Sequence, residues 1–315
     1  MSIGVGLGLA NFTFSSAAGY WAWVRRCDDA GVDSLWQTDR LVSREPYLEC
    51  MSAMAGIAGA SRNLKFGMNV AMLAIRDPLL IAKQCATIDY LSGGRLLPAF
   101  GIGSTRSRDF TATGRSTKGR GTRMNEALEL LTRLWTEESV TFHGEHFTYE
   151  DVTISPRPVQ TPVPLWIGGS SEAAIERTAR WGTGWQGSYE APEQAGETVA
   201  AIHAAAALHG RRIDPDHMGI GLGVRFGDWD EPAVERAARA YAERTGRDAR
   251  DGGLAVGSGD DMLRLIERFV ANGVAKFILR PIADGDADMT AQTERLIAEV
   301  LPEVRAMNAR RKSTA

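Results

Sequence analysis

The residues best suited to chemistry are the four that follow the short apolar stretch Leu165 to Ile167. They read Gly168-Gly169-Ser170-Ser171 and stand directly before a segment with helical periodicity, Glu172 to Trp181. Glycines let the backbone approach a ligand closely, and free N–H groups at a helix start attract phosphate or another anion. The pattern therefore predicts an anion site. A simpler interpretation is that Ser170 or Ser171 caps the helix, and both can hold together.

A basic loop is the second candidate. It begins at Ser104, after the apolar stretch Leu96 to Phe100 and the turn Gly101-Ile102-Gly103. Between Ser104 and Arg123 the only acid is Asp109. The cations are Arg106, Arg108, Arg115, Lys118, Arg120 and Arg123. Such a run usually marks a solvated loop, but a loop behind a strand of an α/β protein lies where ligands bind. We therefore expect this loop to face an anionic ligand.

The composition narrows the class of function. The chain has 315 residues, of which 44% are hydrophobic and 24% charged, and its formal net charge is -3. These values are ordinary for a soluble globular domain. A negative chain with one short basic cluster does not fit a nucleic-acid-binding protein. Because no apolar run of about 18 residues and no signal-type N-terminus occurs, we expect a cytoplasmic protein with no membrane partner.

Two groups of residues that could bind a metal or form disulfides are interpreted as structural. The cysteines are Cys27, Cys50 and Cys85. They lie far apart without paired spacing, which predicts reduced, buried thiols. His143 and His146 flank Glu145 in a predicted hairpin. Polar residues in a solvated turn explain this group more simply than metal ligation does, so we expect no metal site.

These residues need a scaffold, and strand and helix signals alternate along the chain. The predicted strands are 3–9, 34–37, 65–68, 95–100, 165–167, 184–186, 218–226 and 275–279. The predicted helices are 17–30, 47–60, 78–91, 122–135, 172–181, 192–209, 232–244, 260–272 and 290–307. Alternation of this kind predicts right-handed crossovers and a parallel sheet. We expect an α/β fold, a (β/α)8 TIM barrel with insertions after strand 4 and late in the chain. Residues 1–308 would form this single domain, and residues 309–315 a flexible C-terminal tail.

The first predicted strand has an unusual face. Ile3 to Leu9 alternates large apolar residues with Gly4, Gly6 and Gly8, so one face of the strand carries no side chains. A bare face suits the crowded interior of a barrel. The same letters look like a nucleotide-binding fingerprint, but no helix begins where that motif requires one.

Short motifs between residues 36 and 170 occur in a specific order. They are Trp36-Gln37-Thr38-Asp39-Arg40, Phe66-Gly67-Met68-Asn69-Val70, Leu91-Ser92-Gly93-Gly94-Arg95, Gly101-Ile102-Gly103, Arg120-Gly121-Thr122-Arg123 with Glu126, Pro156-Arg157-Pro158, and Ile167-Gly168-Gly169-Ser170. Each motif is weak alone, but in this order the set resembles the luciferase-like flavin-dependent oxidoreductases. The resemblance implies a barrel that binds FMN or the deazaflavin F420 at the carboxyl ends of its strands.

The resemblance also implies site residues. Asn69-Val70 matches a non-prolyl cis peptide that bulges behind the flavin ring in this family. The cofactor-binding candidates are Asn69, Val70, Gly103, Ser104, Arg106, Arg123, Gly168, Gly169 and Ser170, of which the last three match the phosphate-binding turn. We expect the strand tips at Asn69, Gly103 and Gly168 to converge on one planar ring system.

The catalytic candidates are Asp39 and Arg40, which match an Asp-His pair of many F420-dependent members. Arginine stays protonated and cannot accept a proton as histidine can. Some members also carry a glutamate acid shortly after the Gly-x-Gly turn, and the corresponding place in this chain is near Arg106. The sequence therefore departs from the sugar-phosphate dehydrogenase pattern. Asp39 could act as a base, as a partner of Arg40, or in a simple surface ion pair.

The basic loop favours F420 over FMN, because F420 has a phosphodiester and a glutamate tail whereas FMN has one phosphate. With F420, the reaction would be hydride transfer to or from a small organic substrate. The alternative is an FMN-dependent monooxygenase that uses reduced flavin and O2 and needs a flavin reductase as partner. A second alternative is a catalytically silent flavin-binding protein. The resemblance also implies a homodimer.

Overall fold

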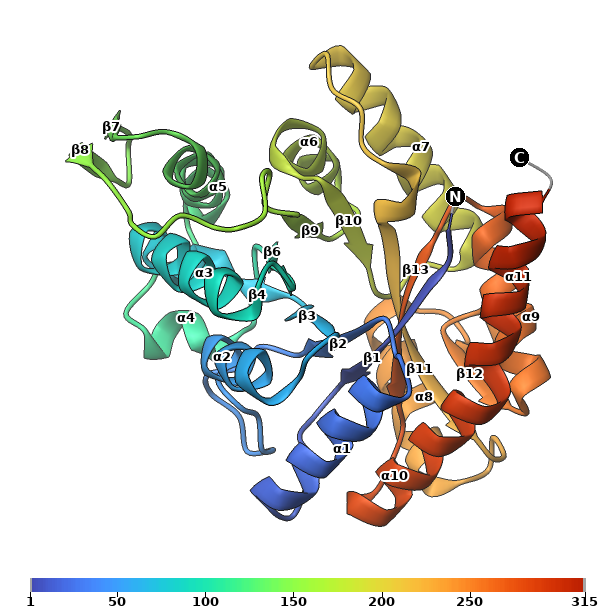
Figure 1. The fold of residues 1–315 in the computed structure, drawn as a ribbon. Coiled ribbons are helices and arrows are strands. Elements are labelled where there is room, and N and C mark those ends of the chain that lie inside the picture. Colours follow the sequence, from blue (N-terminus) through green and yellow to red (C-terminus); the bar gives the residue numbers. More distant parts are fainter. Residues whose placement is uncertain (1, 314–315) are drawn as a thin grey trace.

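The computed structural model describes residues 2–313, and its central feature is a curled parallel sheet with helices around it (Figure 1). The sheet has 11 strands. They are β1 (Gly4–Leu9), β2 (Ser34–Gln37), β3 (Lys65–Met68), β4 (Ala71–Met72), β5 (Leu96–Leu97), β6 (Ala99–Gly101), β9 (Trp166–Gly168), β10 (Gly184–Gly187), β11 (Met218–Phe226), β12 (Leu254–Gly257) and β13 (Lys276–Pro281). This arrangement puts the carboxyl ends of the strands on one side of the molecule.

The strand order shows how the sheet curls. The order is β4-β6-β9-β10-β11-β13-β1-β2-β3-β5, and β12 pairs with β11 outside this path. The first strand, β1, therefore lies beside the last strand, β13. Asn69 and Val70 separate β3 from β4, and Pro98 separates β5 from β6. Because β3 pairs with β5 and β4 pairs with β6, the two interrupted strands run side by side.

Helices follow the strands on the outer side of the sheet. They are α1 (Ala17–Asp29), α2 (Cys50–Ala60), α3 (Pro78–Ser92), α4 (Arg108–Ala112), α5 (Arg120–Thr136), α6 (Glu172–Trp181), α7 (Pro192–Leu208), α8 (Pro232–Thr245), α9 (Gly259–Ala271), α10 (Gly285–Arg295) and α11 (Leu301–Ser313). A π-helical segment, η4 (Leu296–Val300), joins the last two, and 3-10 turns occupy η1 (Leu73–Ile75), η2 (Pro215–His217) and η3 (Ala249–Asp251). The antiparallel hairpin β7 (Val140–His143) and β8 (Thr148–Val152) stands apart from the main sheet.

Local sequence explains where the helices begin and end. Helix α3 begins after Asp77, whose side chain accepts a hydrogen bond from the Leu80 amide, and Pro78 occupies its first turn. The helix ends at Gly93, which has φ of 67°, a left-handed conformation that glycine adopts at low cost. The chain then turns directly into β5, as the sequence predicts.

The interior of the sheet is crowded, and the glycines of β1 face it. A Cβ added at Gly6 would lie 2.4 Å from the hydroxyl oxygen of Ser34 and 3.0 Å from the indole nitrogen of Trp36. Trp36 meets Trp166 edge to face, with ring centroids 6.0 Å apart. Trp36 and Ser34 occupy the space that Gly6 leaves, which confirms the interpretation of the alternating pattern.

Several element boundaries differ from the predictions. The strand predicted at 95–100 is two strands because Pro98 has no N–H to donate. Strand β12 and helix α4 were not predicted, and the helix predicted at 290–307 is a continuous run over α10, η4 and α11. Helix α11 extends to Ser313, into the segment for which a flexible tail was predicted, and residues 314–315 lie outside the described residues. Among residues 2–313, no helix is long and apolar enough to cross a membrane.

Candidate functional site

The interruption between β3 and β4 forms the floor of the candidate site. The peptide bond between Asn69 and Val70 is cis, as the resemblance implies. The Val70 side chain lies against Gly101 at the end of β6 and Gly168 at the end of β9. An added Cβ would lie 2.7 Å from Val70 Cγ2 at Gly101, and 2.9 Å from it at Gly168. These two positions therefore leave room for Val70 because they have no side chain.

The tip of β6 reaches the same place. Gly103 has φ of 78°, and an added Cβ there would lie 2.7 Å from the sulfur of Met72 and 3.1 Å from the Phe110 ring. Met72 belongs to β4, the strand that follows the bulge. The predicted strand tips at Asn69, Gly103 and Gly168 are thus brought together around the segment from Asn69 to Met72.

Polar atoms without partners lie beside the bulge. The side-chain amide of Gln186, at β10, donates to the carbonyl oxygen of the Asn69 side chain. The other amide atoms of this pair, Asn69 Nδ2 and Gln186 Oε1, are buried and have no hydrogen-bond partner in the described chain. Buried polar groups are usually satisfied, so one free donor and one free acceptor here indicate a place for a polar ligand edge.

The turn between β9 and α6 keeps its donors available. Ser171, not Ser170, caps the helix, and its hydroxyl accepts from the Ala174 amide at 3.3 Å. Gly169 has φ of 105°, and its carbonyl accepts from the Trp185 indole at 2.8 Å. No acceptor among residues 2–313 bonds the amides of Ser170, Glu172 or Ala173. The helix cap and the predicted anion site are therefore compatible.

Three arginines gather where α5 approaches α6. Arg177 Nε donates to Asn125 Oδ1 at 2.7 Å, which links α6 to the first turns of α5. Arg120 Nε and Arg123 Nη1 are buried and have no hydrogen-bond acceptor among the described residues. None of the three arginines forms an ion pair with a carboxylate in residues 2–313. Burial lowers the pKa of Arg177, and the charge of Arg120 lowers it further. The cluster therefore has positive charge and unused donors, which suits an anion.

Sequence reasoning found Arg123 but missed Arg177. The signal was available, because Arg177 lies on the buried face of α6 with Ala174 and Thr178. A cation at such a position needs a buried partner or a ligand.

The remaining cations of the basic loop are on the surface. Arg106, Arg108, Arg115 and Lys118 are exposed, and no acid among residues 2–313 pairs with them. Ser104 is also exposed, and its hydroxyl accepts from the Arg106 amide at 3.2 Å. Asp109 anchors the loop, since its buried carboxylate accepts from the Val42 amide at 2.8 Å. The loop is thus held close to the segment that follows β2.

Asp39 is not paired with Arg40, and it is not in a surface ion pair; both predictions are wrong. Its buried carboxylate accepts two hydrogen bonds of 2.7 Å from the guanidinium of Arg76 and one of 2.9 Å from the Met72 amide. Burial alone would lower the pKa of Arg76, but the hydrogen bonds and charge of Asp39 outweigh it and the pKa is raised. Asp39 therefore ties the end of β2 to β4, and its two oxygens are already engaged.

Arg40 lies on the surface. Its guanidinium carbon is 5.9 Å from the centre of the Tyr47 ring, a weak cation–π contact. Asp39 and Arg40 were paired as candidates because they match the Asp-His pair of the family. In the structure the two side chains are separated, since Asp39 is buried against Arg76 and Arg40 is exposed.

The histidines of the hairpin have protein partners. His146 Nε2 bonds with the Thr122 hydroxyl at 2.8 Å, and His143 Nε2 lies 3.2 Å from Glu150. Glu126 accepts from the amides of the hairpin turn, residues 145 to 147. In the part of the chain that the structure describes, no group of three or more His, Cys, Asp or Glu side chains could hold a metal ion.

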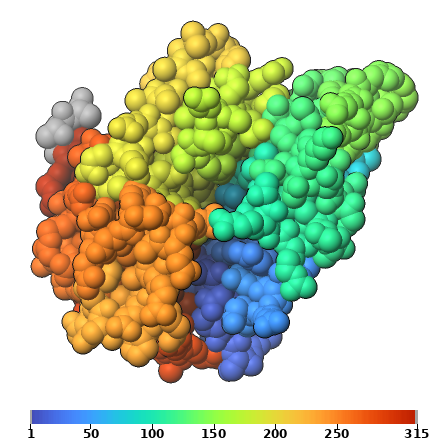
Figure 2. Space-filling model, turned by 180° about the vertical axis from the view of Figure 1, so that it is seen from behind, coloured from blue at the N-terminus to red at the C-terminus, as the bar shows by residue number. Residues whose placement is uncertain are grey.

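A pocket of about 310 Å³ lies at the carboxyl ends of β1, β10 and β13, next to α8. Its lining includes Asn11, Tyr189 and Arg280. Seen from behind, the molecule is recessed between the orange segment that contains α8 and the teal and blue segments (Figure 2). The pocket therefore lies at the end of the sheet where α/β proteins bind ligands.

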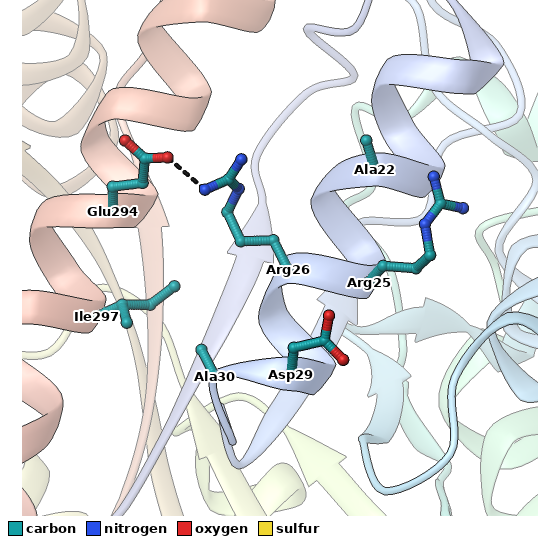
Figure 3. Close-up of a pocket in the computed structure, with 7 residues that line it drawn as sticks. All are labelled: Ala22, Arg25, Arg26, Asp29, Ala30, Glu294 and Ile297. Carbon is teal, nitrogen blue, oxygen red and sulfur yellow. Dashed lines mark hydrogen bonds and ion pairs between the residues drawn. The ribbon is translucent and has the colours of Figure 1, made fainter.

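A second hollow, of about 590 Å³, lies on the outer side of the helices (Figure 3). Residues of α1 form one wall, and Glu294 and Ile297 form the other. Figure 3 shows Arg26 of α1 bonded to Glu294 across it. Its charged side chains are exposed, and none of its lining residues belongs to a strand of the described chain. The hollow has none of the features expected of a cofactor site.

Comparisons with known proteins agree with this geometry. A family model described as luciferase-like monooxygenase matches residues 10–279. The F420-dependent glucose-6-phosphate dehydrogenase of Kineococcus radiotolerans is 31% identical over 168 residues, 51% of this chain and 49% of its own. The FMNH(2)-dependent dimethylsulfone monooxygenase of Pseudomonas putida is 31% identical over 171 residues, 53% of this chain and 46% of its own. The chain spans about half the length of the curated relatives it matches.

Solved structures show the shared fold over nearly the whole chain. The monooxygenase RslO1 from Streptomyces bottropensis has a TM-score of 0.82 at 21% identity, covering 96% of this chain and 99% of its own. An F420-dependent secondary alcohol dehydrogenase, solved in complex with an F420-acetone adduct, has a TM-score of 0.81 at 19% identity with the same coverage. At these identities the likeness concerns the fold alone.

Proposed function

The chain belongs to the luciferase-like monooxygenase family, and from this premise we propose that it is an F420-dependent oxidoreductase that transfers a hydride to or from a small organic substrate. The observation that carries the choice of cofactor is the cluster of Arg120, Arg123 and Arg177, which has two buried donors without acceptors in the described chain. The phosphodiester and glutamate tail of F420 would satisfy more of this positive charge than the single phosphate of FMN.

The residues present fit such a cofactor. The free amides of Ser170, Glu172 and Ala173 would bind its phosphate. Val70 would support one face of its ring. Asn69 and Gln186 would orient the polar edge of the ring, since each has one free amide atom. When bound, F420 would supply the hydride chemistry itself. Asp39 would act as a positioning residue, because both of its oxygens are occupied. The exposed Arg40, the exposed Arg106 and Ser104 would contact only the outer part of the cofactor or substrate.

We also propose that the sheet forms a closed barrel of eight strands. If β3 with β4, and β5 with β6, each count as one interrupted strand, the pairings describe a closed (β/α)8 barrel. The hairpin and the loop before α5 would be its insertion after strand 4, and the segment around α8 and β12 the late insertion. Residues 1–308 would form one domain in a cytoplasmic homodimer. FMN-dependent monooxygenation with a flavin reductase is the second candidate, supported by the dimethylsulfone monooxygenase among the relatives.

The test is a titration of the purified protein with F420 and with FMN at low ionic strength. We expect F420 to bind at least about tenfold more tightly than FMN. The double variant Arg120→Gln/Arg123→Gln should weaken F420 binding about tenfold and FMN binding less. Arg133→Gln is the matched control, because Arg133 is also on α5 but pairs with Glu137 on the surface.

Each other result has a definite meaning. Tighter binding of FMN would replace the first candidate with the monooxygenase, to be followed by O2 uptake in the presence of a flavin reductase. Equal losses for both cofactors in the double variant would remove the tail argument. Failure of both cofactors to bind below about 1 mM would overturn the proposed function. Binding without turnover would support a silent flavin-binding protein.

A further inference from the structure

Arg280, on β13, is a cation without an anionic partner. Its guanidinium donates to the Gly221 carbonyl at 3.1 Å, and its Nε is buried with no acceptor in the described chain. No carboxylate among residues 2–313 lies within ion-pair distance of it. Arg280 lines the pocket at the carboxyl ends of the strands, so its remaining exposure is toward that space.

The electrostatic surroundings make this arrangement costly. Burial is the main cause that lowers the pKa of Arg280; Tyr189 opposes the shift, and the positive charge of Arg244 adds to it. A guanidinium nevertheless remains protonated in proteins. A buried charge without a counter-ion is unfavourable. A negatively charged ligand group would remove this cost, whereas a neutral one would offset only part of it.

The walls of the pocket limit the shape of the ligand. Ala233, Ala237 and Ala240 lie on one face of α8, and Leu254 and Ile282 add apolar surface. Asp284, the one acid among the described residues that line the pocket, pairs with Arg236 at 3.1 Å. With a volume of about 310 Å³, the pocket is at the small end of the range of about 300 to 1,000 Å³ that ligand sites occupy. A small molecule with an apolar body fits it.

The pocket adjoins the place proposed for the cofactor ring. A Cβ added at Gly221 would lie 3.5 Å from the guanidinium carbon of Arg280 and 3.7 Å from the free amide nitrogen of Asn69. Arg280 and the bulge at Asn69 therefore approach the same glycine from two sides. A ligand held by Arg280 would have its body in the α8 pocket and would lie next to the bulge.

From these observations we infer that Arg280 binds the carboxylate of a small organic acid whose apolar body occupies the pocket beside α8, and that this acid belongs to the substrate class of the enzyme. The inference deepens the proposed function and rests on it, because the acid is a substrate only if the protein is the proposed oxidoreductase. The binding of the acid itself requires no cofactor.

The experiment is isothermal titration of the protein with benzoate and isobutyrate, each compared with its neutral amide, benzamide or isobutyramide, at constant ionic strength. We expect at least one carboxylate to bind about tenfold or more tightly than its amide. Arg280→Gln should abolish this preference, and Arg280→Lys, which keeps the charge, should retain part of it. Arg264→Gln is the control for net charge, because Arg264 is exposed on α9 and pairs with Asp261.

The outcomes separate this inference from the proposed function. If the wild-type protein does not prefer carboxylates to amides, or if Arg280→Gln keeps the preference, the carboxylate site does not exist. If Arg280→Gln instead weakens F420 or FMN binding tenfold, Arg280 belongs to the cofactor and the inference is overturned. If neither cofactor binds but the carboxylate preference disappears only in Arg280→Gln, the site stands and the proposed function fails. Circular dichroism on each variant checks folding. If Arg280→Gln does not fold, Arg280→Lys is the test: a reduced carboxylate preference supports the site, and an unchanged preference overturns it.

Discussion

Replacing Asp39 tests whether this residue is structural or a free catalytic base. In Asp39→Asn, the side chain keeps one carbonyl oxygen but turns an NH2 group toward the donors of Arg76. The bidentate contact and the charge are both lost, while Arg76 remains largely buried, with Glu49 3.7 Å away as its nearest remaining acid. We therefore expect Asp39→Asn to destabilise the fold and to loosen the connection between β2 and β4.

The magnitude follows from the burial of the pair. The Asp39 side chain is 0% exposed and that of Arg76 11%, so solvent screens their interaction little. Removing one partner of a buried ion pair costs about 3 to 5 kcal/mol, because the other charge is left uncompensated. Glu49 and the Met72 carbonyl, which Arg76 also contacts, should hold the loss near about 3 kcal/mol. The double variant Asp39→Asn/Arg76→Met should lose less than the sum of the single losses, by about 1 to 3 kcal/mol.

Urea unfolding followed by tryptophan fluorescence measures these free energies for the wild type, the two single variants and the double variant. Glu137→Gln is the control, because its partner Arg133 forms an i,i+4 pair on the surface of α5 and the loss should be about 0.5 kcal/mol or less. The structural role of Asp39 is refuted if Asp39→Asn is no more destabilised than Glu137→Gln, or if the losses of unfolding free energy in the two single variants simply add. Asp39 would then again be a candidate for the catalytic base.

Two further predictions concern packing. Gly168→Ala should displace Val70, whose methyl carbons lie 2.9 and 3.1 Å from the new Cβ. This change should destabilise the fold by about 1 to 3 kcal/mol and weaken cofactor binding. Gly59→Ala in α2 should instead stabilise the fold by about 0.5 to 1 kcal/mol, because nothing lies within 4 Å of the new Cβ. Urea unfolding and cofactor titration check both, and unchanged affinity in Gly168→Ala would contradict the role given to Val70. The three cysteines are buried, and burial raises the pKa of the Cys27, Cys50 and Cys85 thiols, so none should react with Ellman's reagent until urea unfolds the chain. Rapid reaction of the native protein would show that one of these thiols is accessible.

Much of the fold was predictable because the signals are local. The Asp77-Pro78 start and the Gly93 end of α3 follow from caps and dihedral preferences that depend on a few neighbouring residues. The bare glycine face of β1 was interpreted correctly for the same reason, since a period of two needs only one strand. Strand β12 and the short helix α4 were missed because each lies inside an irregular segment, where packing against the rest of the protein determines the backbone conformation.

The candidate site likewise has features that depend on neighbouring residues in the chain and features that depend on the tertiary structure. From the sequence alone, the glycine turn before α6 and the basic character of the loop after β6 could be identified, because each is a property of consecutive residues. The place of the Asn69-Val70 bulge was implied by the resemblance to the family. Only the tertiary structure paired Asp39 with Arg76, 37 positions away, brought Arg177 to Arg120 and Arg123, and left Arg280 without a counter-ion. Those arrangements depend on which strand tips meet when the sheet curls. The energy of a charge depends on its neighbours in space and on its distance from water, and the order of residues in the chain specifies neither directly.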